Sequence, residues 1–518
     1  MAGLNFDRKL QLVKLKDHQH LSYRQTSQKT GIPKSTIHDN INQFRKEAEA
    51  FNSAINADPV ERLVRTTLIL AMNGKCSTRD TASTISLIWN TMVSQQTILK
   101  ILNLSATVAK ELNKKVDLKP VQSGLFDEVF QNSLPLLVFA DSTSGVIGLK
   151  APQDRSGDSW EGFLKDLKKL GLNPDTIVTD GGTGLLKGIK EVFGSATLVR
   201  DLFHVLQKLG KAARVMERFC YNLLGKSYEF KAKNDIAGAK DAMDKFDEAA
   251  TLFDVFEKPL KEFKLSCTLA HPDSDKGYVE SGDLLKIIVS IQESLYLFKE
   301  KFCRHKAIKD AWSYLKNGAQ EIVAYKKTIE VLVERAFGPR YEEMVRESFC
   351  PFIEYIHRYM RAHDSVAERE FWGKKIVELR QRFRSYTVAD QDEVDNAINM
   401  IWAVGLKSSK SNSFIETVNS VIRRYLNTYN SIPCWFCPIF TLFWNNRKFA
   451  RGKRAKMSPK QLLSGNNQSD WVEKIIEKFP LEKLRSSIPA IPGYFNPEWD
   501  RANRKPNGHR VQILRVAG

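Results

Sequence analysis

The chain has 518 residues, enough for roughly three to four domains. Hydrophobic residues make up 42% and charged residues 27%, a balance that excludes a disordered chain. Lys and Arg number 79 against 60 Asp and Glu, so the net charge of +19 favours a polyanionic partner such as nucleic acid or an acidic membrane surface.

The sequence predicts neither a membrane span, nor a secretion signal, nor a disulfide framework. Its longest apolar stretches, residues 133–140 and 434–444, are shorter than the roughly 20 residues that cross a bilayer. The first ten residues lack the apolar core of a signal peptide, and seven scattered cysteines indicate a reduced, intracellular protein. Cys434 and Cys437 have C-x-x-C spacing, but a zinc site needs two more ligands, so core packing is favoured over metal or redox use.

Residues 1–55 predict a helix-turn-helix unit. Ser22 is a suitable N-cap for a first helix that ends at Gly31, and Pro33 and Ser35 open a second helix. Two short helices joined by a turn with glycine form the helix-turn-helix pattern, although a hairpin that only packs is the alternative. The second helix would present polar side chains to base edges and phosphates: Lys34, Ser35, Thr36, His38 and Asn42.

Residues 56–120 predict a second unit of the same kind. Ser77 and Ser94 can each cap a helix, with a turn over residues 90–93 between the two helices. A purely structural helical linker is an equally open interpretation. Residues 1–120 hold 18 basic and 10 acidic side chains, so this part of the chain is itself positively charged.

From about residue 124 the pattern becomes mixed α/β. Apolar runs predict five strands, over residues 125–130, 135–140, 145–149, 176–179 and 196–199. Helices are predicted over residues 158–170, where Asp158 and Glu161 suggest a capping box, and over residues 183–193. Three strands followed by alternation predict a mixed sheet with helices against its faces.

Residues 205–405 are almost entirely helical in pattern. Apolar stripes predict helices over residues 283–302 and 320–337 that face a core. No repeat of fixed period occurs, which argues against a solenoid.

Three carboxylates stand out by their settings. Asp127 lies inside a predicted buried strand, Asp180 ends another strand, and Glu416 lies on a later helix. A charge in an apolar strand is costly unless it is paired, and carboxylates at adjacent strand ends converge. Such a group can hold two Mg²⁺ (or Mn²⁺) ions about 3.5–4 Å apart for in-line phosphoryl transfer. A cap or turn role is the alternative, and Asp141, at the end of the second strand, is the rival for the first position or a turn cap.

The order of FDEVF, PLLVFAD, TIVTDGG, RDLFH and SNSFIETVN resembles the DDE transposases of insertion sequences, in the branch that includes the Mutator-like group. The resemblance covers about residues 120–460. It implies an RNase H-like catalytic fold in which Asp127, Asp180 and Glu416 are the catalytic and metal-binding acids, and Asp141 is a non-essential residue of the second strand. Glu416 then follows a helical insertion similar to those of this branch.

The RDLFH motif adds Asp201 and His204, which share a face if they lie on a helix. In the families that the sequence resembles, a Cys or Asp followed by His is frequent here. His204 is therefore predicted to touch DNA or to support the metal site, with a buried structural histidine as the equal alternative.

The segment after Glu416 is strongly basic. Residues 417–469 contain nine Lys or Arg and neither Asp nor Glu. Seven of these basic residues lie close together and suit a sequence-independent DNA track: Arg447, Lys448, Arg451, Lys453, Arg454, Lys456 and Lys460. The aromatic residues between 435 and 444 suit core packing, with stacking on unpaired bases as the alternative.

The expected organisation is an α/β catalytic domain interrupted by a large all-α insertion and preceded by all-α helix-turn-helix DNA-binding units. The expected boundaries are 1–55 and 56–120 for those units, 121–210 for the first part of the core, 211–405 for the insertion, 406–465 for the last part of the core, and 466–518 for a tail. We expect a cytoplasmic, nucleoid-associated transposase of bacterial type that acts as a homo-oligomer on double-stranded DNA, both terminal repeats and target. A non-catalytic DNA-binding regulator and a nuclease without strand transfer are the alternatives.

Overall fold

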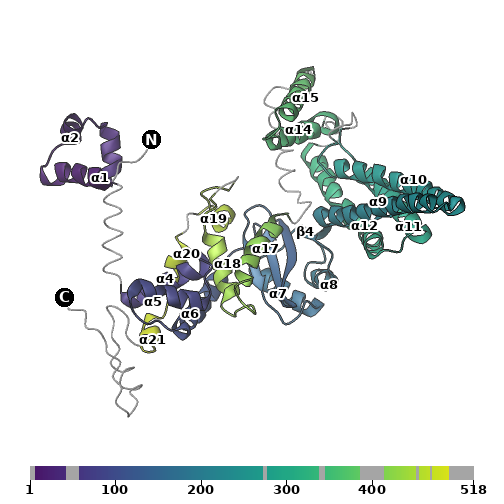
Figure 1. Ribbon diagram of the computed structural model, residues 1–518. Coiled ribbons are helices and arrows are strands. Elements are labelled where there is room, and N and C mark those ends of the chain that lie inside the picture. Colours follow the sequence, from purple (N-terminus) through teal and green to yellow (C-terminus); the bar gives the residue numbers. More distant parts are fainter. Residues whose placement is uncertain are drawn as a thin grey trace, which may run out of the picture. The chain divides into compact units, whose positions relative to one another are not determined.

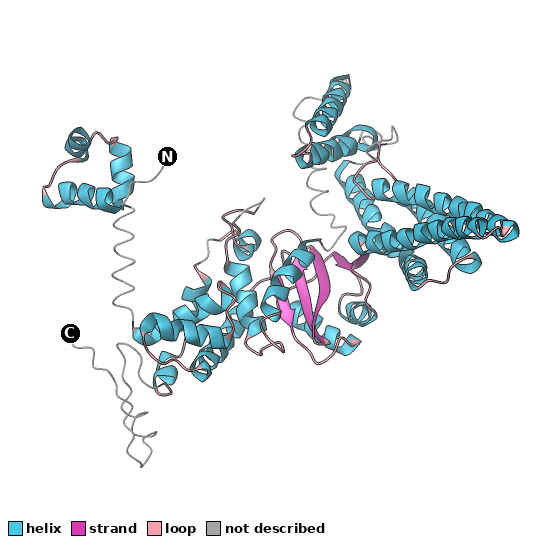
Figure 2. Ribbon diagram, viewed as in Figure 1, coloured by secondary structure: helices cyan, strands magenta, loops and turns pink. Residues whose placement is uncertain are grey.

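The computed structural model describes residues 6–42, 58–271, 277–337, 345–385, 413–450, 454–466 and 469–488, together with residue 399 (Figure 1). These residues are mostly helical and contain one five-stranded sheet (Figure 2). The chain divides into two compact units, Met1–Val108 with Val472–Gly518 and Ala109–Trp471. Among the helices that the structure describes, none has both the length and the apolar character needed to span a bilayer.

The first unit begins with the two helices predicted around Gly31. Ser22 caps helix α2 (Tyr23–Thr30) by accepting a hydrogen bond from the Gln25 amide at 3.3 Å, and Gly31 ends it at φ +70°. A second helix covers residues 34–42, where Ile37 and Ile41 are buried. Both pack with Leu12 of the preceding helix α1 (Phe6–Val13), which runs on into a π-helical turn, η1 (Lys14–His18).

Three longer helices follow in this unit. Helix α4 (Pro59–Met72), which the sequence analysis did not place, starts at an Asp58 cap. The predicted caps are confirmed for the next two helices: Ser77 caps α5 (Thr78–Trp89), and Ser94 accepts from the Thr97 amide at 3.1 Å in the first turn of α6 (Gln95–Asn113). Two short helices from the C-terminal part of the chain also belong to the described part of this unit: α20 (Trp471–Ile476) and α21 (Leu481–Arg485).

The second unit is built around the predicted mixed sheet. Its strands lie in the order β3-β2-β1-β4-β5. Strands β1, β2 and β3 pair antiparallel, whereas β4 runs parallel to β1 and β5 parallel to β4. Each strand begins and ends within two residues of its prediction: β1 (Ser123–Gln131), β2 (Leu134–Asp141), β3 (Ile147–Lys150), β4 (Thr176–Thr179) and β5 (Thr197–Arg200).

Helices α7 (Gly157–Lys169) and α8 (Thr183–Val192) share an apolar core with the sheet, in which Trp160 is fully buried. The predicted capping box of Asp158 and Glu161 is wrong. Ser156 takes the N-cap position, because its hydroxyl accepts from the Ser159 amide at 3.3 Å. Asp158 instead lies in the first turn and pairs with Lys187 at 3.1 Å.

Long helices follow directly after β5. The prediction over residues 283–302 corresponds to α11 (Ser281–Lys301), whereas residues 320–337 are only the second half of α12 (Lys306–Phe337). Helix α12 packs against both α9 and β5, which brings the helical part against the edge of the sheet. The helical elements are α9 (Leu202–Ala232), α10 (Ile236–Ser266), α11 (Ser281–Lys301), α12 (Lys306–Phe337), the π-helical turn η3 (Val345–Phe349), α14 (Cys350–Arg361) and α15 (Val366–Ser385).

The chain then returns to the sheet. Helix α17 (Ser413–Leu426) packs against β1 and β2, α18 (Phe436–Asn446) packs against β3, and α19 (Pro459–Ser464) follows. The aromatic residues of this segment are core residues, as favoured, and the base-stacking alternative is wrong because they are at most 5% exposed: Trp435, Phe436, Phe440, Phe443 and Trp444.

The C-x-x-C pair lies just before and within α18. Cys434 is exposed in the turn before the helix, so its assignment to the core is wrong. Cys437 is half-buried, and burial raises the pKa of its thiol to about 12. None of the seven cysteines forms a disulfide.

Candidate active site

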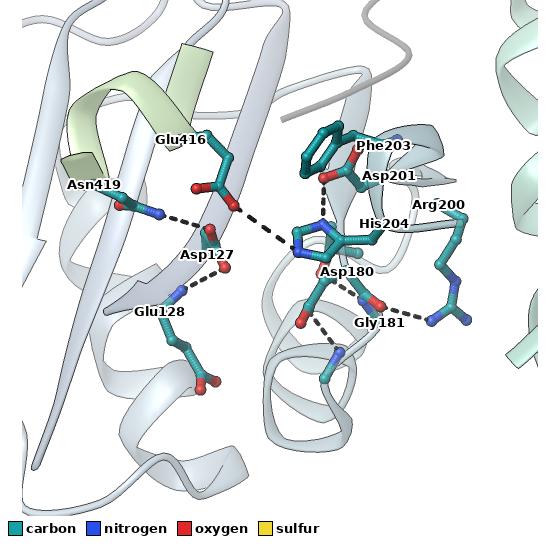
Figure 3. A network of polar contacts seen from close by, with 12 residues as sticks. Asp127, Glu128, Asp180, Gly181, Arg200, Asp201, Phe203, His204, Glu416 and Asn419 are labelled. Atoms are coloured by element: carbon teal, nitrogen blue, oxygen red, sulfur yellow. Dashed lines mark hydrogen bonds and ion pairs between the residues drawn. The ribbon is translucent and has the colours of Figure 1, made fainter. Parts of the chain in front are cut away.

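Asp127 lies in the middle of β1 and is 8% exposed. Its Oδ2 accepts a hydrogen bond from Nδ2 of Asn419 on α17 at 2.7 Å, and its Oδ1 accepts from the Glu128 amide at 2.8 Å (Figure 3). Because side chains alternate along a strand, the Glu128 carboxylate points elsewhere and accepts from Nε1 of Trp160 on α7 at 3.0 Å. Asp127 therefore faces α17 and not the core under α7.

Glu416 lies in the first turn of α17, three residues before Asn419. Residues three apart share a face of a helix, so the helix that holds Asp127 through Asn419 also presents Glu416 on that side (Figure 3). Its carboxylate lies 3.9 Å from Nε2 of His204 and 3.9 Å from Arg423. The sequence analysis did not identify Asn419, although the spacing in SNSFIETVN contained the signal.

Asp180 directly follows β4. Phe126 of β1 is paired with Thr179 of β4, so Asp127 and Asp180 are each one residue beyond an aligned pair on adjacent parallel strands. The Asp180 Oδ1 accepts from the Gly182 amide at 3.0 Å, which anchors the carboxylate in the tight turn at the strand end. Gly181 adopts φ +84° in this turn, a conformation that favours glycine.

The main chain of Asp180 is held from a distant part of the sequence. Its carbonyl oxygen accepts from the Tyr314 hydroxyl of α12 at 2.8 Å and from Arg200 Nη1 at 3.1 Å. Arg200 is 5% exposed, forms an ion pair with Glu321 of α12 and lies over the Tyr314 ring. A Cβ on Gly181 would lie 1.2 Å from Arg200 Nη1, so only glycine leaves room for the guanidinium.

Asp201 and His204 form a pair at the start of α9. Asp201 is fully buried and caps the helix by accepting from the Phe203 amide at 2.9 Å. Its other oxygen accepts from Nδ1 of His204 at 2.7 Å, and this hydrogen bond raises the pKa of the imidazole. With Nδ1 bound to Asp201, Nε2 is turned toward Glu416 (Figure 3).

The site carries an excess of negative charge. The pKa of Asp127 is raised to about 7, chiefly because burial disfavours its charged form, and further because Asp180 and Glu416 repel it. His204 acts in the opposite direction. Within the described ranges, no group of three or more His, Cys, Asp or Glu stands ready to hold a metal ion. The carboxylates are thus close enough to repel one another but are not drawn together into a ligand set.

Part of this site lies in a stretch that matches a known family. Residues 134–258 match the family described as Transposase, Mutator family. The chain carries a Mutator-type transposase domain. A comparison with curated proteins finds no match. The matched stretch includes Asp180, Asp201 and His204, whereas Asp127 and Glu416 lie on either side of it.

Asp141, the rival first acid, ends β2 of the transposase domain and is 2% exposed. Its carboxylate accepts from the Ser144 amide at 2.6 Å and from the Ser144 hydroxyl at 2.5 Å. These two bonds close the turn between β2 and β3. Of the two roles that the sequence allowed for Asp141, first acid or turn cap, its geometry is that of a turn cap.

The predicted DNA-contacting residues of the first unit lie at the start of the helix over residues 34–42. Lys34, Ser35 and His38 are exposed and Thr36 is half-buried. The His38 ring stands edge-to-face against Tyr23 of α2, with ring centroids 5.4 Å apart. This contact holds the imidazole against the preceding helix.

The basic residues that follow the third acid are divided between surface and structural positions. Lys448 is exposed, whereas Arg447 is half-buried and lies 3.8 Å from the Trp444 ring centroid. Arg454 donates to the carbonyl oxygens of Thr143, at 3.0 Å, and of Ser142, so it holds the turn that Asp141 closes. Arg451 and Lys453 lie outside the described residues.

Proposed function

We propose that the protein is a DDE transposase that binds element ends, cleaves a DNA strand there and joins the freed end to target DNA, with Asp127, Asp180 and Glu416 as its catalytic acids. The observation that carries the proposal is the meeting of β1, β4 and α17. Asp127 and Asp180 follow an aligned pair on adjacent parallel strands, and α17 reaches Asp127 through Asn419 while presenting Glu416. The strand order, three antiparallel strands and then two parallel ones, supports an RNase H-like core.

The chemistry of the three carboxylates fits a divalent cation, although the structure does not draw them together into a ligand set. Carboxylate oxygens are the ligands that Mg²⁺ and Mn²⁺ prefer, and the repulsion that raises the pKa of Asp127 is what a bound cation would relieve. In this proposal Asp127, Asp180 and Glu416 hold two Mg²⁺ ions, or Mn²⁺. When bound, the ions lower the pKa of an attacking oxygen and stabilise the leaving one.

The neighbouring side chains orient the acids. Asn419 donates to one oxygen of Asp127 and fixes the rotation of its carboxylate. The Asp201 carboxylate accepts from Nδ1 of His204 and raises the pKa of the ring, which favours the positively charged imidazolium beside Glu416. His204 is then a positioning residue within the transposase domain.

The proposed chemistry has two in-line substitutions at phosphorus. In cleavage, a water oxygen attacks the phosphorus at the element end, the bond to the 3′ oxygen breaks, and a 3′-hydroxyl is left on the element. In joining, this 3′ oxygen attacks a phosphorus of the target DNA, loses its proton to solvent, and displaces a second 3′ oxygen. Recognition of the ends is assigned to the helix-turn-helix formed by α2 and the helix over residues 34–42.

Single substitutions of the acids test the proposal. Asp127→Asn, Asp180→Asn and Glu416→Gln keep side-chain size and each remove one charge. Each variant should cut an element-end duplex in Mg²⁺ more than about 100-fold more slowly, since loss of an outer-shell partner alone costs about 10–100-fold. Binding of the duplex should persist. Asp158→Asn is the matched control, because that carboxylate is exposed on α7.

The outcomes separate the three candidate functions. Normal cutting by all three variants would overturn the assignment of the acids. A wild-type protein that binds the ends without cutting them would be a DNA-binding regulator. Cutting without joining, assayed with supercoiled target DNA, would identify a nuclease that lacks strand transfer.

A further inference from the structure

Helix α9 has one exposed face that is both basic and aromatic. Residues spaced by three, four, seven or eight positions lie on one side of a helix, and here they define what we call the α9 stripe: Phe203, Lys211, Arg214, Arg218, Tyr221 and Tyr228. The three basic residues are exposed, and the three aromatic ones are 49%, 64% and 63% exposed. Large aromatic side chains this exposed, grouped with cations on one face of a helix, indicate a surface for a partner.

The charge of the helical part is unevenly distributed. Helices α9 and α10 have 31 residues each and pack side by side (Figure 1). Helix α9 has six basic and two acidic residues, whereas α10 has five basic and seven acidic ones. The positive side of this pair of helices is therefore α9.

Among the residues that the structure describes, none forms an ion pair with the cations of the stripe, although Glu217 lies three residues after Arg214 on the same side of α9. In contrast, Lys245 and Lys261 of α10 each pair with a carboxylate one turn earlier, at 2.6 and 2.8 Å. Lys211, Arg214 and Arg218 lie within two turns and repel one another. An anionic partner would relieve that repulsion.

The stripe begins at the candidate active site. The Phe203 ring lies edge-to-face against His204, with centroids 5.7 Å apart, beside Glu416 (Figure 3). From Phe203 to Tyr228 the helix rises about 38 Å at 1.5 Å per residue. At 3.4 Å per base pair this length corresponds to about 11 base pairs of DNA.

We propose that the α9 stripe binds the phosphate backbone of the DNA that leads away from the cleavage site. Lys211, Arg214 and Arg218 pair with successive phosphates, and the hydroxyls of Tyr221 and Tyr228 donate to phosphate oxygens. From the sequence, residues 205–405 were predicted only to be helical in pattern, and no role was assigned to the residues of the stripe. The inference rests on the proposed function in one respect, that DNA is the ligand of the active site.

Removing the charge of the stripe is the first test. The full-length triple variant Lys211→Gln, Arg214→Gln, Arg218→Gln is compared with Lys240→Gln, Lys258→Gln, Lys264→Gln, which removes the same charge from exposed positions of α10. Binding of a fluorescent 40-base-pair duplex is titrated by anisotropy at several NaCl concentrations. The stripe variant should lower the slope of log K against log[NaCl] by up to about 2.7, and the α10 variant by much less. Equal losses, or no loss in the stripe variant, would overturn the proposal.

Photo-crosslinking is the second test, and it does not depend on the size of the affinity loss. Tyr221 or Tyr228 is replaced by benzoylphenylalanine in the full chain and irradiated with the same duplex. Tyr296 on α11, which is 46% exposed, is the control position. DNA crosslinks at positions 221 and 228 and not at 296 are expected. Crosslinks to protein only at 221 and 228 would mean that the stripe binds a protein partner.

Both tests are run in EDTA, where no cleavage is required. If the acid variants cleave normally while the stripe variant loses binding, only the catalytic assignment fails. If the stripe variant binds like wild type while the acid variants are inactive, only the α9 proposal fails. Because all six substituted positions are exposed, unchanged thermal unfolding is expected for both triple variants.

Discussion

At the scale of single residues, Asp127 combines burial with two neighbouring negative charges. Its pKa of about 7 lies above the ordinary value of 3.8, so the folded protein holds this proton more tightly than the unfolded chain does. A group of this kind stabilises the fold when it is protonated, and the stabilisation is lost as pH rises from about 4 to about 7. In the absence of a cation, the ionised carboxylate is a cost to the fold.

Asp127→Asn should therefore gain stability relative to wild type as pH rises. In EDTA, the difference in free energy of unfolding between variant and wild type should increase from pH 4 to pH 7 by up to about 4 kcal/mol, the equivalent of a shift of about three pH units. Urea denaturation at several pH values measures this difference, in which the titrating groups that do not interact with Asp127 cancel. Parallel curves for the two proteins would contradict the burial argument. Added Mg²⁺ should stabilise wild type at pH 7 and not the variant.

Asp201→Asn should lower the pKa of His204. The pKa of the ring is raised chiefly by the hydrogen bond from Nδ1 to the Asp201 carboxylate, and an amide cannot provide the negative charge. Asparagine is also a good N-cap, so α9 should remain intact. Titration of the His204 Cε1–H signal by NMR, in wild type and in the variant, measures the change. An unchanged pKa would show that Asp201 acts only as a helix cap.

The sequence predicted acids by their local settings and missed the groups that hold them. Asp127 and Asp180 could be identified because a charge within or at the end of an apolar strand is costly. Asn419 was missed although it lies one turn from Glu416 on the same helix. Tyr314 could not be found, because its hydroxyl meets the Asp180 carbonyl across 134 residues of sequence and no local pattern records that contact.

At the scale of elements, helix α12 supports the turn after β4. The Tyr314 hydroxyl and Arg200 both donate to the Asp180 carbonyl, and Glu321 holds Arg200 in place. The apolar stripe of α12 indicated only that this helix packs in a core. In the structure, α12 also supports the end of β4, where Asp180 lies.

Tyr314→Phe should slow cleavage without weakening DNA binding. The variant keeps the ring under the Arg200 guanidinium and removes one hydrogen bond to the Asp180 carbonyl, which is worth about 0.5–1.5 kcal/mol, or roughly 2- to 12-fold in rate. Single-turnover cleavage at saturating DNA measures the rate. Tyr296→Phe on α11 is the matched control and should cut at the wild-type rate. A loss confined to binding would mean that α12 does not support the site.

The limits of elements were predictable where local chemistry sets them. Strand ends agreed within two residues, and Ser22, Ser77 and Ser94 all start helices as predicted. The start of α7 was misplaced because Ser156 and Asp158 are both acceptable caps, and only the backbone conformation at Ser156 decides between them. The first half of α12 was not predicted because polar residues interrupt its apolar stripe. Tyr314, which contacts the Asp180 turn, lies in this half.

At the scale of the whole molecule, the N-terminal unit is the proposed reader of the element end. Lys34→Gln with Ser35→Ala and His38→Ala should reduce the preference for an element end over unrelated DNA, since each lost base contact costs about 1–3 kcal/mol of discrimination. Competition gel shifts measure the ratio. Lys29→Gln, an exposed change on α2, should leave it unaltered. A uniform loss on all DNA would mean that these residues contact only the backbone.

The closure of the first unit by the other end of the chain could not be predicted. Arg65 of α4 forms an ion pair with Glu473 of α20, and Arg485 of α21 pairs with Asp58. These partners are about 400 residues apart in sequence, and periodicity indicates that a helix has a partner without indicating which one. The sequence analysis therefore treated residues 466–518 only as a tail.

The separation of 236 positions between Asp180 and Glu416 in the sequence also imposes an order in time. A ribosome that adds about 5–20 residues per second needs roughly 12 to 47 s to pass from the second proposed acid to the third. From residue 228 onward in that interval, the nascent chain has β1, β4 and the α9 stripe but not α17. On the proposed assignment, a chain that ends early at a premature stop codon would therefore bind DNA without cutting it. Such a chain would compete with full-length transposase for the element ends.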